Sequence, residues 1–283
     1  MTVERYLRPR SVEEALSLLA EYRDEAKVVA GGQSLMVLLH EGLIAPRALI
    51  SLSLVSELGG ITVNGQAHIG AMASHTQVLR HPGIRATWPV LAQAEEAVSS
   101  EQIRNRGTLC GNLAHAYPTA DPPAALMAVD AELTLRSPAG ERRVPVTDFV
   151  LGPLTTVLEP DELVTAVTLP APPDGARYAY LKYAVRPLDF AILGVAVRLA
   201  IDAEGRCHQV RIGLNGAANR PMRATGAEQV LEGASAVGAA EVAAAADAAA
   251  DQSDPLGEVF ESSGYRRDMV RVYVRRALER ALR

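Results

Sequence analysis

The sequence predicts an α+β protein of three units, in which two mixed subdomains precede a C-terminal sheet backed by helices. Short β-branched runs alternate with helical periodicity as far as a proline-rich stretch, PAPPDGA at 170–176. After that stretch come longer strand patterns and alanine-rich helical segments. A chain of 283 residues, 48% of them hydrophobic, is long enough to bury the cores that these units need.

The first unit, residues 1–55, is expected to be a β-α-β-α-β layer. In SVEEALSLLAEY the apolar residues recur at helical spacing, and Ser11 with Glu14 forms a candidate capping box at its start. β-Branched and apolar runs on either side of a second helical pattern indicate strands. We expect these elements at 11–22 (helix), 26–32 (strand), 34–43 (helix) and 48–55 (strand).

The second unit, residues 56–174, begins with the strongest turn signal in the chain. Asn64 and Gly65 separate two alternating runs, which predicts a β-hairpin with a two-residue turn. Pro89 suits the first turn of a helix. The remaining elements are expected at 74–84 and 88–98 (helices), 131–150 (hairpin) and 162–170 (strand).

The third unit, residues 175–283, is expected to be a three-stranded antiparallel sheet with helices. The alanine-rich run has high helical propensity, so we assign it to a helix although its composition is simple. The basic cluster at 265–280 is mixed with acids at helical spacing, which favours a solvated or interface helix face over a nucleic-acid patch. Strands are expected at 178–184, 190–205 and 207–218, and helices at 236–252 and 262–282.

Composition excludes several classes of function. The net charge of -5 and the sequence pI near 5.7 argue against nucleic acid as a main partner. No apolar run reaches the roughly 20 residues of a membrane span. The charged N-terminus lacks the apolar region of a secretory signal, so we expect a cytoplasmic protein unless it is exported folded with a partner. Two cysteines, Cys110 and Cys207, are too few for an iron-sulfur cluster, and no metal-ligand spacing is present.

Two glycine-bearing turns are the main candidates for a binding site. VVAGGQSL, Val28 to Leu35, places two glycines after a strand, and Thr108 to Asn112 forms a second such turn in another subdomain. Each could be an ordinary turn, or could present backbone N-H groups to an anion. Neither has the G-x-G-x-x-G or Walker A pattern. Together they would suit a pyrophosphate held between subdomains.

Polar residues elsewhere add weaker signals. Asp121, between prolines, could cap a helix or accept hydroxyls of a sugar or ribityl chain, and both roles are compatible. His115 has no nucleophile beside it, and no G-x-S-x-G motif supports a hydrolase. Arg186 and Asp189 are explained by a surface ion pair, whereas Lys182, on a strand among aromatics, could lie near an electron-accepting ring.

Four segments occur in an order that resembles the FAD-binding medium subunits of molybdenum hydroxylases, the xanthine dehydrogenase and carbon monoxide dehydrogenase family. They are AGGQSL at 30–35, RNRGTLCGNLAHAYPTADPPAAL at 104–126, ELVTAVTLP at 162–170 and KYAVRPLDFA at 182–191. The likeness covers nearly the whole chain. It implies a two-subdomain FAD-binding fold of the vanillyl-alcohol-oxidase (PCMH) type, followed by a C-terminal α+β domain.

The resemblance also implies a set of FAD contacts. The first turn would line the adenine-diphosphate side of the cofactor, and the second turn would close on the diphosphate. Val98 would flank the cofactor and Asp121 would bind its polar chain. Leu163 and Lys182 would lie near the isoalloxazine. Cys110 and Tyr117 depart from the family, which more often has glycine and aspartate there. The complete expected set is Val28, Val29, Ala30, Gly31, Gly32, Gln33, Ser34, Leu35, Val98, Thr108, Leu109, Cys110, Gly111, Asn112, His115, Asp121, Leu163 and Lys182.

The activity that the resemblance implies is electron transfer and not hydroxylation itself. Electrons would pass from two [2Fe-2S] clusters of a small partner subunit through FAD to an external acceptor, in a complex with a large molybdenum-cofactor subunit, as a dimer of heterotrimers. A stand-alone flavoenzyme that oxidises a small molecule directly is the alternative. A binding or assembly module that has lost FAD is a third possibility.

Overall fold

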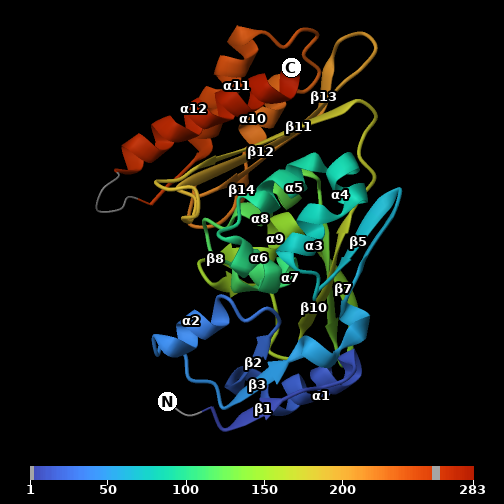
Figure 1. Cartoon of the computed structure of the whole chain (residues 1–283). Coiled ribbons are helices and arrows are strands. Elements are labelled where there is room, and N and C mark those ends of the chain that lie inside the picture. Colours follow the sequence, from blue (N-terminus) through green and yellow to red (C-terminus); the bar gives the residue numbers. More distant parts are fainter. Residues whose placement is uncertain (1–2, 257–261) are drawn as a thin grey trace.

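The computed structural model describes residues 3–256 and 262–283 and begins with a small parallel sheet at one end of the molecule (Figure 1). The three strands lie in the order β1-β3-β2, and helices α1 and α2 supply the crossovers that parallel pairing requires. Ser11 caps α1 as predicted, but Glu14 accepts from the N-H of Arg10, so the capping box is half formed. The bounds are Arg5–Leu7 (β1), Val12–Tyr22 (α1), Ala26–Val29 (β2), Leu35–His40 (α2) and Ala48–Ser51 (β3).

The second unit is built on a five-stranded antiparallel sheet in the order β4-β5-β10-β6-β7. The predicted hairpin is confirmed, but Asn64 pairs with Gln66, so the turn is centred on Gly65, with φ of 80°, and is not the expected two-residue turn. Its strands are Ile61–Asn64 (β4), Gln66–Gly70 (β5), Glu132–Ser137 (β6), Gly140–Pro145 (β7) and Leu163–Leu169 (β10), with a small hairpin of Val150–Gly152 (β8) and Thr155–Thr156 (β9). Its helices are His75–Arg80 (α3), Pro82–Thr87 (α4), Pro89–Glu96 (α5), Glu101–Arg106 (α6), Leu109–His115 (α7), Asp121–Ala128 (α8) and Val146–Phe149 (α9).

The C-terminal unit is a four-stranded antiparallel sheet, one strand more than the sequence predicts. The additional strand, β14, has only two residues, too few to produce an alternating pattern. Helix α10 was also missed, because it is a short segment after a turn. The bounds are Ala176–Tyr183 (β11), Leu193–Ile201 (β12), Cys207–Asn215 (β13), Met222–Arg223 (β14), Thr225–Leu231 (α10), Ala239–Gln252 (α11) and Ser263–Leu282 (α12).

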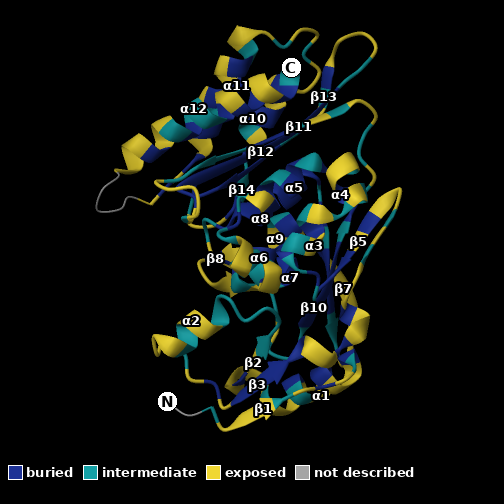
Figure 2. Ribbon diagram, viewed as in Figure 1, coloured by how far each residue is buried: buried dark blue, intermediate teal, exposed yellow. Residues whose placement is uncertain are grey.

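The buried hydrophobic residues form two clusters, and Figure 2 marks buried residues in dark blue along the ribbon. The first includes Leu16 and Ile50 of the first unit together with Leu133 and Phe149 of the second, so these two units share one core. The second lies between the C-terminal sheet and helices α10, α11 and α12, which cover its outer face (Figure 1). The shared first core fixes the two N-terminal units relative to each other, which a site made from both requires.

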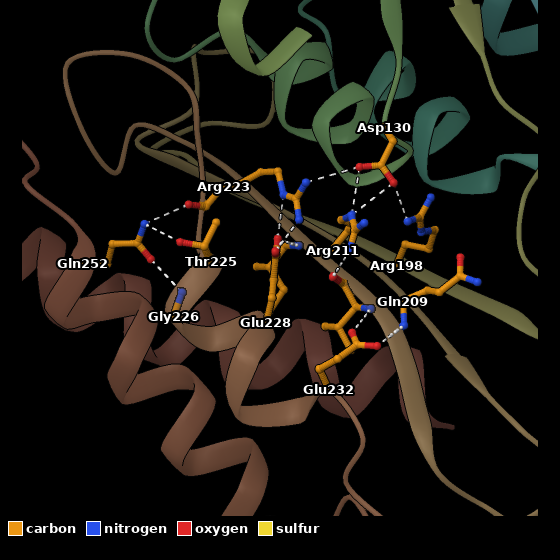
Figure 3. A network of polar contacts seen from close by, with 12 residues as sticks. Asp130, Arg198, Gln209, Arg211, Arg223, Thr225, Gly226, Glu228, Glu232 and Gln252 are labelled. Carbon is orange, nitrogen blue, oxygen red and sulfur yellow. Dashed lines mark hydrogen bonds and ion pairs between the residues drawn. The ribbon is translucent and has the colours of Figure 1, made fainter. Parts of the chain in front are cut away.

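Helix α8 joins the C-terminal unit to the rest of the chain. A Cβ added to Gly213 of β13 would lie 2.1 Å from the carbonyl oxygen of Ala124, so the helix backbone rests directly on the strand. Asp130, just after the helix, accepts from Arg198 at 2.6 Å, Arg211 at 2.8 Å and Arg223 at 3.3 Å (Figure 3). Cations at the C-terminal end of a helix also complement its dipole. Packing and charge together hold the third sheet against α8.

Candidate cofactor site

The two glycine-bearing segments meet in backbone contact. A Cβ added to Gly31 would lie 2.1 Å from the carbonyl oxygen of Arg106 and 2.7 Å from the Cα of Gly107, so no side chain fits there. A Cβ added to Gly111 would lie 2.7 Å from the Thr108 hydroxyl oxygen and, in ordinary contact, 3.7 Å from the Cβ of Ala30. The two segments come from the first and second units. Their close approach produces a bare backbone surface, called the cradle below: residues 28–35 and 106–112.

The first half of the cradle leaves several N-H donors available. Within the described residues no acceptor takes the backbone N-H groups of Gly32, Gln33 and Ser34. Gly32 has φ of 75°, and the side chain of Gln33 donates to the carbonyl of Gly31 at 3.2 Å, which fixes the turn. Residues 28–35 are all half-buried. Successive N-H groups in such a turn form a concave site for an anion.

The second half is the start of a helix, which corrects the prediction of a turn at 108–112. Thr108 is the N-cap of α7, and its hydroxyl oxygen accepts from the N-H of Gly111 at 3.1 Å. Cys110 is therefore in helical conformation, where a side chain is permitted, as expected. The side-chain oxygen of Asn112 is buried, with no partner among the described residues. A buried polar atom without a partner at this position fits a bound ligand.

Cys110 is packed into the core behind the cradle. Its side chain is 3% exposed, and burial together with the nearby negative charge of Glu95 raises the pKa of the thiol to about 12. A thiol with this pKa stays protonated and is a poor nucleophile at neutral pH. The thiol therefore contributes packing and not reactivity.

Asp121 and Lys182 form a buried polar cluster with Tyr180. The carboxylate accepts from the Tyr180 hydroxyl at 2.6 Å and from the Lys182 ammonium at 3.0 Å. Burial raises the pKa of Asp121, although Lys182 opposes this effect. Burial and the Asp121 charge raise the pKa of Tyr180 well above its usual value. The prediction that Asp121 caps α8 is wrong, because the N-cap is Ala120 and no side chain caps it.

Lys182 also connects this cluster to the segment that contains Val98. Its ammonium donates to the carbonyl oxygen of Ala97 at 2.8 Å, and Arg104 donates to the carbonyl of Val98 at 2.8 Å. Tyr180 is not among the residues expected from the sequence, although its two-residue spacing from Lys182 places both side chains on one face of the strand. The structure thus brings Asp121, Lys182 and the neighbourhood of Val98 together.

Two other expected contacts lie apart from this cluster. Leu163 is buried at the start of β10, opposite Arg136, and no described contact links it to Lys182. His115 ends α7; burial lowers its pKa, and its ring lies parallel to that of Tyr117, with centroids 6.2 Å apart. The Tyr117 ring in turn packs against the Phe190 ring, with the two ring centroids 4.6 Å apart.

Phe190 was not singled out from the sequence. Its side chain is 65% exposed, on the loop between β11 and β12, and no periodicity marks a loop residue for a role. The predicted ion pair between Arg186 and Asp189 is confirmed on the same loop, at 3.0 Å. The loop brings an exposed aromatic side chain from the C-terminal unit to the end of α7.

The fold and the cradle define a class of protein in which bare backbone from two units, with N-H groups that have no acceptor among the described residues, is suited to an anionic ligand. No group of three or more potential metal ligands occurs in the described part of the chain. None of its described helices is both long and apolar enough to cross a membrane.

Comparisons with known proteins make the class specific. Residues 2–172 match the family "FAD binding domain in molybdopterin dehydrogenase", and residues 178–281 match "CO dehydrogenase flavoprotein C-terminal domain". The chain therefore belongs to the FAD-binding medium subunits of molybdenum hydroxylases, oxidoreductase subunits whose cofactor is FAD.

Individual relatives are similar over nearly their full length. Subunit alpha of the 6-hydroxypseudooxynicotine dehydrogenase complex of Paenarthrobacter nicotinovorans is 36% identical over 98% of this chain and 94% of its own. The carbon monoxide dehydrogenase medium chain of Hydrogenophaga pseudoflava is 35% identical over 98% and 96%. A carbon monoxide dehydrogenase structure from the same organism superimposes with a TM-score of 0.95, at 35% identity, over 100% of this chain and 99% of that one.

Proposed function

We propose that this chain relays electrons from the [2Fe-2S] clusters of a small partner subunit, through FAD, to an external acceptor. In this proposal the second partner is a large subunit that carries the molybdenum cofactor. The three subunits form a dimer of heterotrimers, and this complex is cytoplasmic. The observation that carries the proposal is the cradle, where Gly31 meets Arg106 and Gly107 with no room for a Cβ. The likeness to subunits of dehydrogenase complexes supports the partners.

The residues of the cradle fit a diphosphate. The N-H groups of Gly32, Gln33 and Ser34 would donate to its oxygens from one unit, and the first turn of α7 would approach it from the other. The orphan oxygen of Asn112 would accept from a hydroxyl or amine of the cofactor. The other residues of 28–35 and 108–112 would line the diphosphate site.

The cluster at Asp121 would serve the other half of the cofactor. Bound FAD supplies a ring that exchanges electrons one or two at a time. Lys182, 11% exposed, would favour a reduced, anionic ring, with its charge moderated by Asp121. Val98, next to Ala97, would provide apolar contact beside Lys182, whereas Leu163 and His115, which lie apart from this cluster, would contact other parts of the cofactor. No residue needs to act as a general base in this relay.

The test begins with the chain purified alone and ends with the chain in its natural host. Incubation with FAD should give a non-covalent flavin spectrum, since no attachment motif is present. A tagged chain from the host should copurify with one molybdenum-containing and one iron-sulfur chain. A flavin-loaded chain that purifies alone and oxidises a small molecule would establish the stand-alone alternative. A chain that stays colourless would refute both.

A further inference from the structure

A buried histidine and glutamate lie directly behind the cradle. His75, the first residue of α3, is 3% exposed, and Glu95, near the end of α5, is 0% exposed. The His75 Nδ1 and Glu95 Oε2 atoms are 2.5 Å apart. The second carboxylate oxygen, Glu95 Oε1, is buried and has no partner among the residues described.

His75 supports the cradle through both its backbone and its ring. Its N-H donates to the carbonyl of Gly107 at 3.0 Å, next to a β-bridge between Ser74 and Thr108. A Cβ added to Gly107 would lie 3.0 Å from the imidazole Cδ2 and 3.3 Å from its Nε2. The Cα of Gly107 would also lie 2.7 Å from a Cβ added to Gly31, second only to the Arg106 oxygen. A side chain at Gly107 would therefore press on the imidazole, while the Cα of Gly107 lies beside the opposite half of the cradle.

Stability alone does not explain this pair. A buried polar pair is often no more stabilising than apolar residues of the same volume, because both partners lose their hydration. The unpartnered Oε1 adds to that cost, and the Glu95 charge also raises the pKa values of Cys110 and Asp121. What the pair provides is a fixed ring orientation, since a carboxylate at Nδ1 allows one placement of the imidazole against Gly107.

We propose that His75 and Glu95 are positioning residues that set the width of the cradle and thereby the affinity for FAD. The inference rests on the proposed role of the cradle as the diphosphate site. The hydrogen bond to Glu95 fixes the orientation of the His75 imidazole. His75 in turn fixes the position of Gly107, through its backbone N-H and its ring. Gly107 then keeps the start of α7 beside Gly31. Neither side chain touches the cofactor in this account.

The test is an FAD titration of three variants of the whole chain. Glu95→Leu removes the acceptor at similar volume and should raise the Kd for FAD about tenfold, the equivalent of about 1.4 kcal/mol. Glu95→Gln keeps an acceptor for His75 and should stay within about threefold of the parent. Glu228→Leu is the matched control, since Glu228 is also a buried glutamate, 6% exposed, but belongs to the C-terminal unit. It should lower the melting temperature and leave the Kd unchanged.

Each outcome decides the proposal. An unchanged Kd in Glu95→Leu would overturn it, and so would an equal loss of affinity in Glu228→Leu, which would reduce the effect to general destabilisation. If Glu95→Leu does not fold, Glu95→Asp, which lengthens the contact to His75, should show an intermediate loss, and parental affinity would overturn the proposal. A parent chain that binds no FAD would instead refute the cradle itself.

Discussion

Gly31→Ala tests the geometry of the cradle most simply. The new Cβ would lie 2.1 Å from the Arg106 carbonyl oxygen, and ordinary contact begins at 3.4 Å, so the two halves must separate by about 1.3 Å. A hydrogen bond of about 2.9 Å lengthened by that amount is lost. Donors on one half would then no longer reach a diphosphate held by the other. Loss of one or two charge-assisted bonds, at about 1.5–3 kcal/mol each, predicts a Kd for FAD about 100-fold higher.

The assay is a titration of the flavin-free chain with FAD, followed by flavin fluorescence. Gly152→Ala is the control, because a Cβ there meets no atom within 4 Å and the residue has no positive φ. It should bind FAD with parental affinity. Parental affinity in Gly31→Ala would refute the reasoning, because the diphosphate would then not depend on the approach of the two segments.

Three further predictions follow from other parts of the structure. Lys182→Ala removes the cation beside Asp121 and should shift the flavin potential negative by about 30 mV, with little change in FAD affinity; an unchanged potential in spectroelectrochemistry contradicts the role of Lys182. Asp130→Ala leaves Arg198 buried without its acceptor, so it should lower the free energy of unfolding by about 3 kcal/mol while FAD affinity is retained. An unchanged midpoint of urea unfolding would contradict this prediction. The Cys110 thiol should resist a thiol reagent until the chain unfolds. Because the folded chain keeps a proton that an unfolded thiol releases above pH 9.0, stability should fall as pH rises from 9.0 towards about 12, and less so in Cys110→Ala.

Local patterns were sufficient for most elements of the fold. The Asn64-Gly65 turn, the helix after Ser11 and the strands at 162–170 and 207–218 were identified from spacing and turn chemistry, because those signals are contained within a few residues. The two glycine segments were also identified from local sequence signals. Bare backbone is visible in the sequence, and the structure places both segments in contact.

What the sequence did not reveal depends on contacts between distant residues. Thr108 to Asn112 has turn composition, yet packing of Leu109 and Leu113 into the first core favours a helix there. Asp121 suits a helix cap, but Tyr180 and Lys182 reach it from 59 and 61 residues away. The pair of His75 and Glu95 spans two helices, and neither residue belongs to a recognisable motif. Such partners are determined by the tertiary fold and leave no local pattern.

The central claim is that two backbone segments from different units hold the diphosphate of FAD. A crystal structure of the chain with FAD tests it most directly. The account predicts diphosphate oxygens within hydrogen-bonding distance of the N-H groups of Gly32 to Ser34 and against the first turn of α7. A diphosphate bound elsewhere, with these N-H groups facing solvent, would contradict it.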